Sequence, residues 1–223
     1  MPQPSERTIL LVASERRELA AFARRLEKPR LLDWGLDYAA EGWCGGTRFL
    51  LAANGAGARL ALRAAEEALA HARPSLIVST GYCGALAPHL RIGDIVVCRQ
   101  AGGEPGEILG VDHVVTTAGD KRKAFARTRA AAVDMESHAL AQLAAGHGIP
   151  FRIIRAVSDE AGEDLGLDLN LARDGEGRIR AATVIRLALL HPFSGLPALK
   201  RLASNASRAS DRLGDFLAST RFD

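Results

Sequence analysis

Aromatic residues and cysteines are both scarce in this sequence of 223 residues. Aromatics make up 5% of it, with two Trp and two Tyr, whereas Ala, Leu and Gly are abundant. This composition favours packed α/β layers over a β-sandwich. The three cysteines, Cys44, Cys83 and Cys98, form no C-x-x-C pair and are odd in number, which excludes a disulfide framework. Free thiols are typical of a reducing compartment, so we expect a cytoplasmic protein.

Long apolar runs and clustered charge are also missing. No run approaches the roughly 18 apolar residues of a membrane span. The apolar stretch "TILLVAS" lies between charged residues, which indicates a buried strand rather than a signal peptide. The net charge of +3 is spread along the chain without a dense Lys/Arg block, so we expect no nucleic-acid partner. The six histidines show no metal-ligand spacing, and we expect no metal site.

Apolar runs of strand length alternate with segments of helical spacing along the chain. A hydrophobic content of 48% is enough for a sizeable core. The alternation predicts a mostly parallel sheet covered on both faces, in a single domain over residues 1–223 whose C-terminal helices begin at about residue 179. The predicted strands cover 7–13, 48–54, 75–80, 93–98, 112–117, 129–134 and 151–159, and the predicted helices cover 15–27, 58–72, 136–148, a polar segment from about 119 and a tail interrupted at "HPFSGLP".

Polar residues and glycines collect where the predicted strands end, and open parallel sheets bind ligands at that rim. Glu136 and Asp159 follow two strands joined by one crossover helix. These strands are expected to be neighbours, which would bring both carboxylates to one cleft. Structural explanations compete. Glu136 at a helix N-terminus gains about 0.3–1 kcal/mol from the helix dipole, and Ser158 or Asp159 is suited to an N-cap. Cys83, between glycines, is either a nucleophile or a packed thiol.

Three longer motifs occur in a fixed order: "STGYCGALAPHLRIGDIVV", "AVDMESHALAQLA" and "PFRIIRAVSDEAGED". Together they resemble the nucleoside phosphorylase type I superfamily, and within it the 5′-methylthioadenosine/S-adenosylhomocysteine nucleosidases, over most of residues 8–165. The resemblance implies a three-layer α/β/α sandwich with a central mixed, mostly parallel twisted sheet. It also implies cleavage of the N-glycosidic bond of an adenine-type purine nucleoside, without a cofactor.

The resemblance assigns roles to individual residues. It implies that Asp159 is the catalytic acid, that Glu136 binds the ribose and that Glu18 positions water. Ser158 and Arg155 would support Asp159, Met135 would lie beside the sugar and base, and the backbone at Gly81, Cys83 and Gly84 would line the substrate.

These residue types suit the chemistry. Breaking a ribosyl–purine bond builds positive charge on the sugar and negative charge on the base. An acid that protonates the purine makes it a better leaving group, so the pKa of Asp159 should be raised by burial or by its neighbours. A carboxylate such as Glu136 accepts hydrogen bonds from both ribose hydroxyls and stabilises the developing positive charge.

The identity of the nucleophile has alternatives. In "ASERREL", Glu18 fits the water-positioning glutamate if one residue is inserted, and Glu15 fits another register; Glu18 is preferred. Phosphorylases of the superfamily often carry a phosphate-binding arginine where this chain has Ser79. Its absence favours hydrolysis over phosphorolysis with phosphate as co-substrate. The arginines near the same rim that would serve a phosphorylase are Arg16, Arg17 and Arg59.

The chain departs from the family in two places. Only a short glycine-rich segment stands between "GDIVV" and "VVTTAGDK", which would leave a larger 5′ site. The Leu-rich C-terminal part, with interspersed Arg and Lys, is explained either as an amphipathic packing helix pair or by a lipid-linked substrate near a membrane surface. The second explanation resembles the hopanoid-associated branch, which releases adenine from an adenosylated lipid, and implies peripheral membrane contact without insertion.

The resemblance also bears on the partners of the protein. The partner is a small-molecule nucleoside, and a homo-oligomer is expected because relatives in the family are often dimers or larger. The competing class is a catalytically silent nucleoside-binding or regulatory module on the same fold, and the presence of both Glu136 and Asp159 favours the enzyme.

Overall fold

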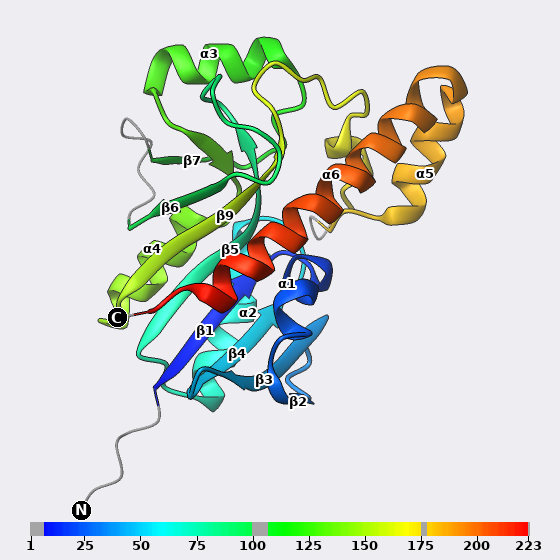
Figure 1. The fold of residues 1–223 in the computed structure, drawn as a ribbon. Helices are drawn as coiled ribbons and strands as arrows, with labels where there is room; N and C mark the ends of the chain where they lie inside the picture. The colour runs from blue at the N-terminus through cyan, green and yellow to red at the C-terminus, as the bar shows by residue number, and fades with distance from the viewer. Residues whose placement is uncertain (1–6, 100–106, 175–177, 223) are drawn as a thin grey trace, which may run out of the picture.

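A mixed sheet with helices on both faces forms the centre of the molecule (Figure 1). The computed structural model describes residues 7–99, 107–174 and 178–222. It confirms the predicted three-layer α/β/α sandwich. The strands are β1 (Thr8–Ala13), β2 (Glu27–Leu31), β3 (Tyr38–Cys44), β4 (Thr47–Ala53), β5 (Leu76–Ala85), β6 (Ile95–Cys98), β7 (Ile108–Gly110), β8 (Ala132–Asp134) and β9 (Phe151–Asp159). The helices are α1 (Arg16–Ala23), α2 (Ala58–His71), α3 (Ala118–Thr128), α4 (Ser137–Gly146), the short 3₁₀ helix Leu169–Ala172, α5 (Ala181–Leu190) and α6 (Pro192–Ser219).

The central strand β5 has three partners. Its first half pairs in parallel with β1, and its whole length from Ile77 pairs in parallel with β9 on the opposite edge. At Gly84 and Ala85 the edge that β1 occupied is taken by β8, which runs antiparallel. The partner of this edge therefore changes between Ser79 and Gly84. Ligands bind at such switch points in open α/β sheets.

This arrangement corrects the prediction that the strands leading to Glu136 and Asp159 are neighbours. They are β8 and β9, and both pair with β5, on opposite edges. The prediction failed because β5 does not end at residue 80. It continues through the "GYCG" segment to Ala85 and so separates the two strands.

The strand predicted at 112–117 is wrong, since the strand in this region is β7. The helix predicted over 15–27 ends at Ala23, and β2 and β3 were not predicted. All five residues of β2 are exposed, so this edge strand carries no apolar pattern. The glycine-rich segment lies mostly at 100–106, outside the described residues.

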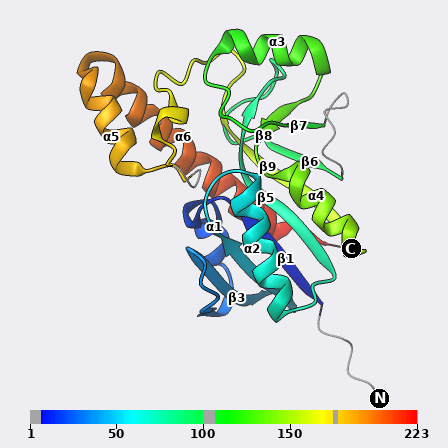
Figure 2. The same ribbon diagram turned by 180° about the vertical axis from the view of Figure 1, so that it is seen from behind.

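The two faces of the sheet have separate cores. Successive residues of β1 point to opposite faces, so Ile9 and Leu11 contact one core while Leu10 and Val12 contact the other. Helices α1 and α6 cover the first face, and α2 and α4 cover the second, as Figures 1 and 2 show from the two sides.

Helix α5 and the first turns of α6 form a hairpin that extends away from the sheet (Figure 1). The predicted interruption at "HPFSGLP" is limited to His191, because Pro192 opens α6 in its first turn, where proline is tolerated. Within the described ranges, no helix combines the length and the hydropathy that crossing a bilayer requires.

Candidate active site

Arg155 is the centre of a buried polar network at the point where the partner of β5 changes. It lies on β9 and is 1% exposed. Its Nη2 atom lies 2.8 Å from Asp134 Oδ2 and 3.2 Å from Glu136 Oε2, and it donates to Ser79 Oγ at 2.9 Å. One guanidinium therefore holds two carboxylates that arrive at the end of β8.

Glu18 approaches the same network from the first turn of α1. Its carboxylate accepts hydrogen bonds from the backbone N–H of Ser14, Glu15 and Tyr82, at 2.8, 3.2 and 3.2 Å. Burial raises the pKa of Glu18 from 4.5 to about 7, and the nearby Arg155 lowers it only in part. Glu18 is therefore a carboxyl group that exchanges a proton near neutral pH.

Glu15, the alternative water-positioning residue, lies elsewhere. It caps α1, and its side chain is 32% exposed and pairs with Arg17 at 2.8 Å. Among the other arginines considered for phosphate, Arg16 lies over the Tyr38 ring and Arg59 is exposed on α2.

Glu136 is fixed from two directions. Its Oε1 accepts a hydrogen bond from the backbone N–H of Gly57 at 2.7 Å, and its Oε2 accepts from Arg155. It precedes α4 as the N-cap residue, but its side chain makes no capping hydrogen bond. Asp134 does this instead, since it accepts from the backbone and the hydroxyl of Ser137. Glu136 thus lies at the N-terminus of α4, as the dipole explanation requires, while its carboxylate is directed at Gly57 and Arg155.

Asp159 lies at the end of β9, across β5 from Glu136. Its Oδ2 lies 2.5 Å from the Nζ of Lys121, which is completely buried, and its Oδ1 accepts from the Ser158 hydroxyl at 2.8 Å. Burial raises the pKa of Asp159, and Lys121 and Ser158 oppose this rise. No helix begins directly after Asp159, because the next one starts at Leu169, so the N-cap explanation for Ser158 or Asp159 is wrong.

The support for Asp159 differs from the sequence expectation. Arg155 was expected beside it, but within the described residues the ion pairs of Arg155 are with Asp134 and Glu136. Lys121 takes that place. Its ammonium also donates to the carbonyls of Glu160 and Glu163, at 2.8 and 3.1 Å, so the turn after β9 holds it.

Two glycines allow these side chains to approach β5. Gly81 has φ of +126°, and a Cβ there would lie 2.6 Å from Glu18 Oε2. A Cβ at Gly84 would lie 2.9 Å from Asp159 Oδ2. The glycines of the "GYCG" segment thus leave room for one carboxylate on each side. On the Glu136 side, half-buried Met135 lies close to Gly57.

Cys83 lies between these glycines but faces the core. It is 3% exposed and packs in an apolar cluster, and burial raises its thiol pKa well above the ordinary value. This favours the packed-thiol interpretation over the nucleophile, because the thiolate is the reactive form. The described residues contain no cluster of His, Cys, Asp and Glu that could hold a metal ion.

Sequence reasoning missed Asp134, Ser137 and Lys121. Asp134 and Ser137 belong to the quoted "VDMES" motif, so their proximity to Glu136 was a usable signal. No sequence signal pointed to Lys121, because it lies in a polar helix in which every lysine is expected to be exposed.

A pocket opens beside the turn that follows Asp159. It contains none of the three predicted catalytic carboxylates, so we do not assign it to the nucleoside. It is lined by Ile92, Glu160, Gly162, Glu163, Arg201 and Asn205.

Comparison with known proteins identifies the family and similar folds. A family model described as the phosphorylase superfamily matches residues 7–107 and 104–191. The fold is similar to that of the 5′-methylthioadenosine/S-adenosylhomocysteine nucleosidase of Helicobacter pylori, with a TM-score of 0.71, 15% identity, and coverage of 97% of this chain and 98% of that one. It is also similar to the futalosine hydrolase of Helicobacter pylori, with a TM-score of 0.69, 15% identity and 95% coverage of both chains. A nucleosidase of the first kind from Neisseria meningitidis has a TM-score of 0.64 and 20% identity, with coverage of 93% and 98%.

Proposed function

The chain belongs to the phosphorylase superfamily, and from this premise we propose that it hydrolyses the N-glycosidic bond of a purine nucleoside and releases the free base. One observation carries the proposal. Glu136 and Asp159 lie on opposite sides of β5, the first held by Arg155 and the second by Lys121. Two carboxyl groups with separate cationic partners suit a reaction in which the sugar becomes positive and the base becomes negative.

On the sugar side, we assign ribose binding to Glu136. Its two oxygens already accept hydrogen bonds from Gly57 and Arg155, which fixes the orientation of the carboxylate. Each oxygen keeps a further lone pair for a ribose hydroxyl. A negative group held there also stabilises the developing positive charge on the sugar, and Met135 beside Gly57 would contact the nucleoside.

On the base side, Asp159 is the proposed acid. Burial raises its pKa, which favours a protonated carboxyl that can donate to the leaving purine. Once the proton has moved, Lys121 and the Ser158 hydroxyl stabilise the carboxylate. The backbone of β5 from Gly81 through Cys83 to Gly84 would line the substrate between the two sides.

Water is the proposed nucleophile, and Glu18 is the proposed group that positions it. A pKa of about 7 lets Glu18 accept a proton from water and release it again near neutral pH. Ser79 stands where phosphorylases of the superfamily often carry a phosphate-binding arginine. It is completely buried and hydrogen-bonded to Ser137 and Arg155. It offers no positive charge to a phosphate ion, which supports hydrolysis.

Release of free base from a nucleoside panel tests the proposal. The panel holds methylthioadenosine, S-adenosylhomocysteine, adenosine, inosine and an adenosylated lipid, each with and without phosphate. We expect base and free sugar without phosphate. A sugar 1-phosphate formed only with phosphate would mean a phosphorylase. Binding without release from any compound would favour the nucleoside-binding module.

Replacing Asp159 tests the acid. Asp159→Asn should lower turnover by at least about 100-fold and leave nucleoside binding within a few-fold, because general acid catalysis contributes about 10²–10⁴. Asp211→Asn is the matched control, since Asp211 is an exposed residue of α6. Turnover and calorimetric binding are measured on both variants. Unchanged turnover in Asp159→Asn would contradict the assignment.

A further inference from the structure

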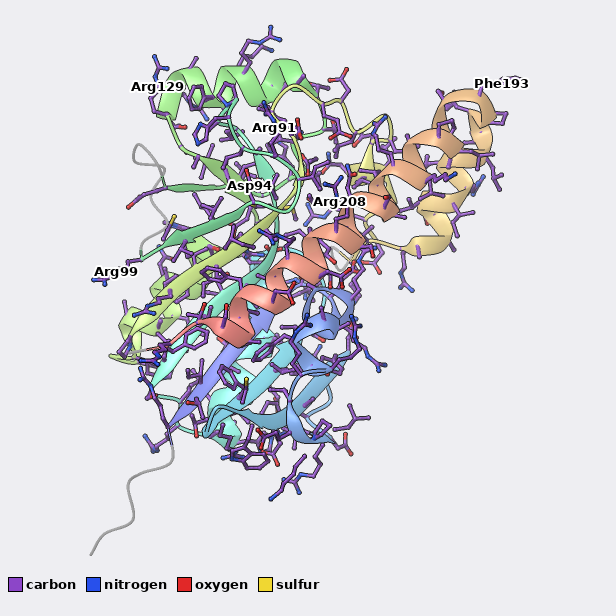
Figure 3. The ribbon with its side chains drawn as sticks, in the orientation of Figure 1. Arg91, Asp94, Arg99, Arg129, Phe193 and Arg208 are labelled. Atoms are coloured by element: carbon purple, nitrogen blue, oxygen red, sulfur yellow. The ribbon has the colours of Figure 1, made fainter. Side chains whose placement is uncertain are left out.

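The end of the α5–α6 hairpin is apolar and exposed. Five large apolar residues within twelve positions are involved, whereas elsewhere in the described chain such residues are scattered singly. Phe193, at the extreme end and pointing away from the molecule in Figure 3, is 97% exposed. We call this surface the hairpin tip, and it consists of Ile185 (49% exposed), Leu189 (58%), Leu190 (62%), Phe193 and Leu196 (42%).

The hairpin does not need the tip for its own packing. Its two helices meet through small residues, and a Cβ at Gly195 would lie 2.5 Å from the carbonyl oxygen of Ala188. Ala188 and Ala198 are buried in the cluster that joins the helices. The residues of the tip stay 42% or more exposed beside this contact, and a contiguous exposed apolar surface of this kind marks an interaction site.

The charged residues of the segment 178–210 are all basic, although Arg178, Arg180 and Arg201 pair with acidic residues outside it. Residues 178–210 contain Arg178, Arg180, Arg186, Lys200, Arg201 and Arg208, and no Asp or Glu. Arg186 and Lys200, closest to the tip in the sequence, are exposed and form no ion pair with any described residue.

We propose that the hairpin tip docks on the surface of an anionic lipid bilayer. An aromatic and aliphatic end inserts into the headgroup region, while the flanking Arg and Lys side chains remain at the level of the lipid phosphates. This placement removes Phe193 and Leu190 from water and matches the one-sided charge of the segment. The proposal does not depend on the proposed hydrolysis.

A second copy of the chain fits the tip less well. Most homo-oligomers have two-fold contacts, in which the same patch lies on both sides of the interface. Such a contact would gather Arg186 and Lys200 of both copies at one interface, without an acidic residue in the segment to compensate. A bilayer that carries negative headgroups avoids this repulsion.

The base of the hairpin leads back to the candidate site. Arg201 pairs with Glu163 and donates to the carbonyl of Asp164 at 2.8 Å. The carbonyl of Glu163 in turn accepts from Lys121, the partner of Asp159. These contacts connect the base of the docked hairpin to the turn that follows Asp159.

Vesicle sedimentation with the full chain tests the proposal. The vesicles contain phosphatidylcholine alone or phosphatidylcholine with about one third phosphatidylglycerol. We expect partitioning about tenfold or more stronger onto the anionic vesicles, and a decrease with added salt because exposed charges are screened. Phe193→Ser combined with Leu190→Ser should lower it at least about tenfold. Arg186→Glu combined with Lys200→Glu should remove the preference for anionic lipid.

Matched variants separate docking from general effects. Leu31→Ser removes a 71% exposed leucine from β2, and Arg122→Glu with Arg127→Glu makes the same charge change on exposed positions of α3. Both should bind as the wild type does. The proposal is overturned if the wild type does not bind or if it binds neutral vesicles equally well. It is overturned as well if these control variants lose as much vesicle binding as the tip variants do. It is also overturned if the chain is an oligomer in solution that Phe193→Ser dissociates, since a second copy would then cover the tip.

Discussion

At the scale of single residues, the site divides its acidic groups between two cations. Arg155 holds Asp134 and Glu136, and Lys121 holds Asp159. Glu18 has mainly backbone donors, and burial raises its pKa to about 7. The protonation of Glu18 and Asp159 should therefore control the pH dependence of the reaction.

The role of Glu18 predicts the acidic limb of the pH profile. Since the proposed base must be deprotonated, kcat/KM should fall as the pH drops below about 7, the pKa of Glu18. Glu18→Gln should lower kcat by about 100-fold or more. Glu15→Gln, in the same turn, should leave kcat within a few-fold. Equal losses in both variants would instead indicate damage to the start of α1.

The ion pair of Lys121 with Asp159 should set the alkaline limb of the pH profile. The acid form of Asp159 is lost as the pH rises through its pKa, and Lys121 lowers that pKa. Lys121→Met should therefore move the alkaline limb of kcat upward by about one pH unit or more. Lys123→Met, on the exposed side of the same helix, is the control. An unmoved limb, with only a lower melting temperature, would make Lys121 a purely structural residue.

At the scale of elements, helix α6 fixes α1 and so positions Glu18. The two helices cross at Gly214, where a Cβ would lie 2.6 Å from the Cβ of Ala21 and 2.8 Å from its carbonyl carbon. Backbone atoms cannot move aside as a flexible side chain does. Gly214 is therefore required by close packing and not by an unusual φ.

Gly214→Ala should destabilise the protein by about 1–3 kcal/mol through overpacking. The melting temperature should fall by about 2–4 °C per kcal/mol for a chain of this size. Gly146→Ala is the opposite control, because a Cβ there meets nothing within 4 Å and alanine favours the helix. Thermal unfolding measures both. A neutral Gly214→Ala would mean that α6 moves away without cost, and that Glu18 does not depend on this crossing.

At the scale of the whole molecule, buried carboxyl groups set the pH dependence of stability. Burial raises the pKa of Glu18, Asp134 and Asp159 above their ordinary values. The folded protein therefore binds protons more tightly than the unfolded chain does. The stability that these groups contribute is present below their ordinary pKa values and is lost as the pH rises through the folded-state values.

The free energy of unfolding should thus be higher at about pH 5.5 than at about pH 8, because Glu18 titrates over this interval. Glu18→Gln cannot ionise, so it should flatten the pH dependence and be more stable than the wild type at about pH 8. Urea unfolding at both pH values provides the measurement. Parallel pH curves for wild type and variant would show that Glu18 does not titrate in this range.

The sequence by itself determined the alternation of strands and helices and the family resemblance, and it proposed "VDMES" and "RAVSD" as the candidate site. These signals are local, since apolar periodicity and short motifs depend on neighbouring residues. Strand β2, exposed throughout, and the continuation of β5 past residue 80 were missed because neither carries such a pattern. β2 is defined by its pairing with β3, the next strand in the chain, and the continuation of β5 by its pairing with β8 and β9, which are distant in the sequence.

Only the tertiary structure decided which charges meet. It buried Lys121 against Asp159 and directed Arg155 to Asp134 and Glu136. It also buried Glu18 while leaving Glu15 in part exposed. These contacts join residues far apart in the chain, and their pKa values follow from burial, which no single segment of sequence determines.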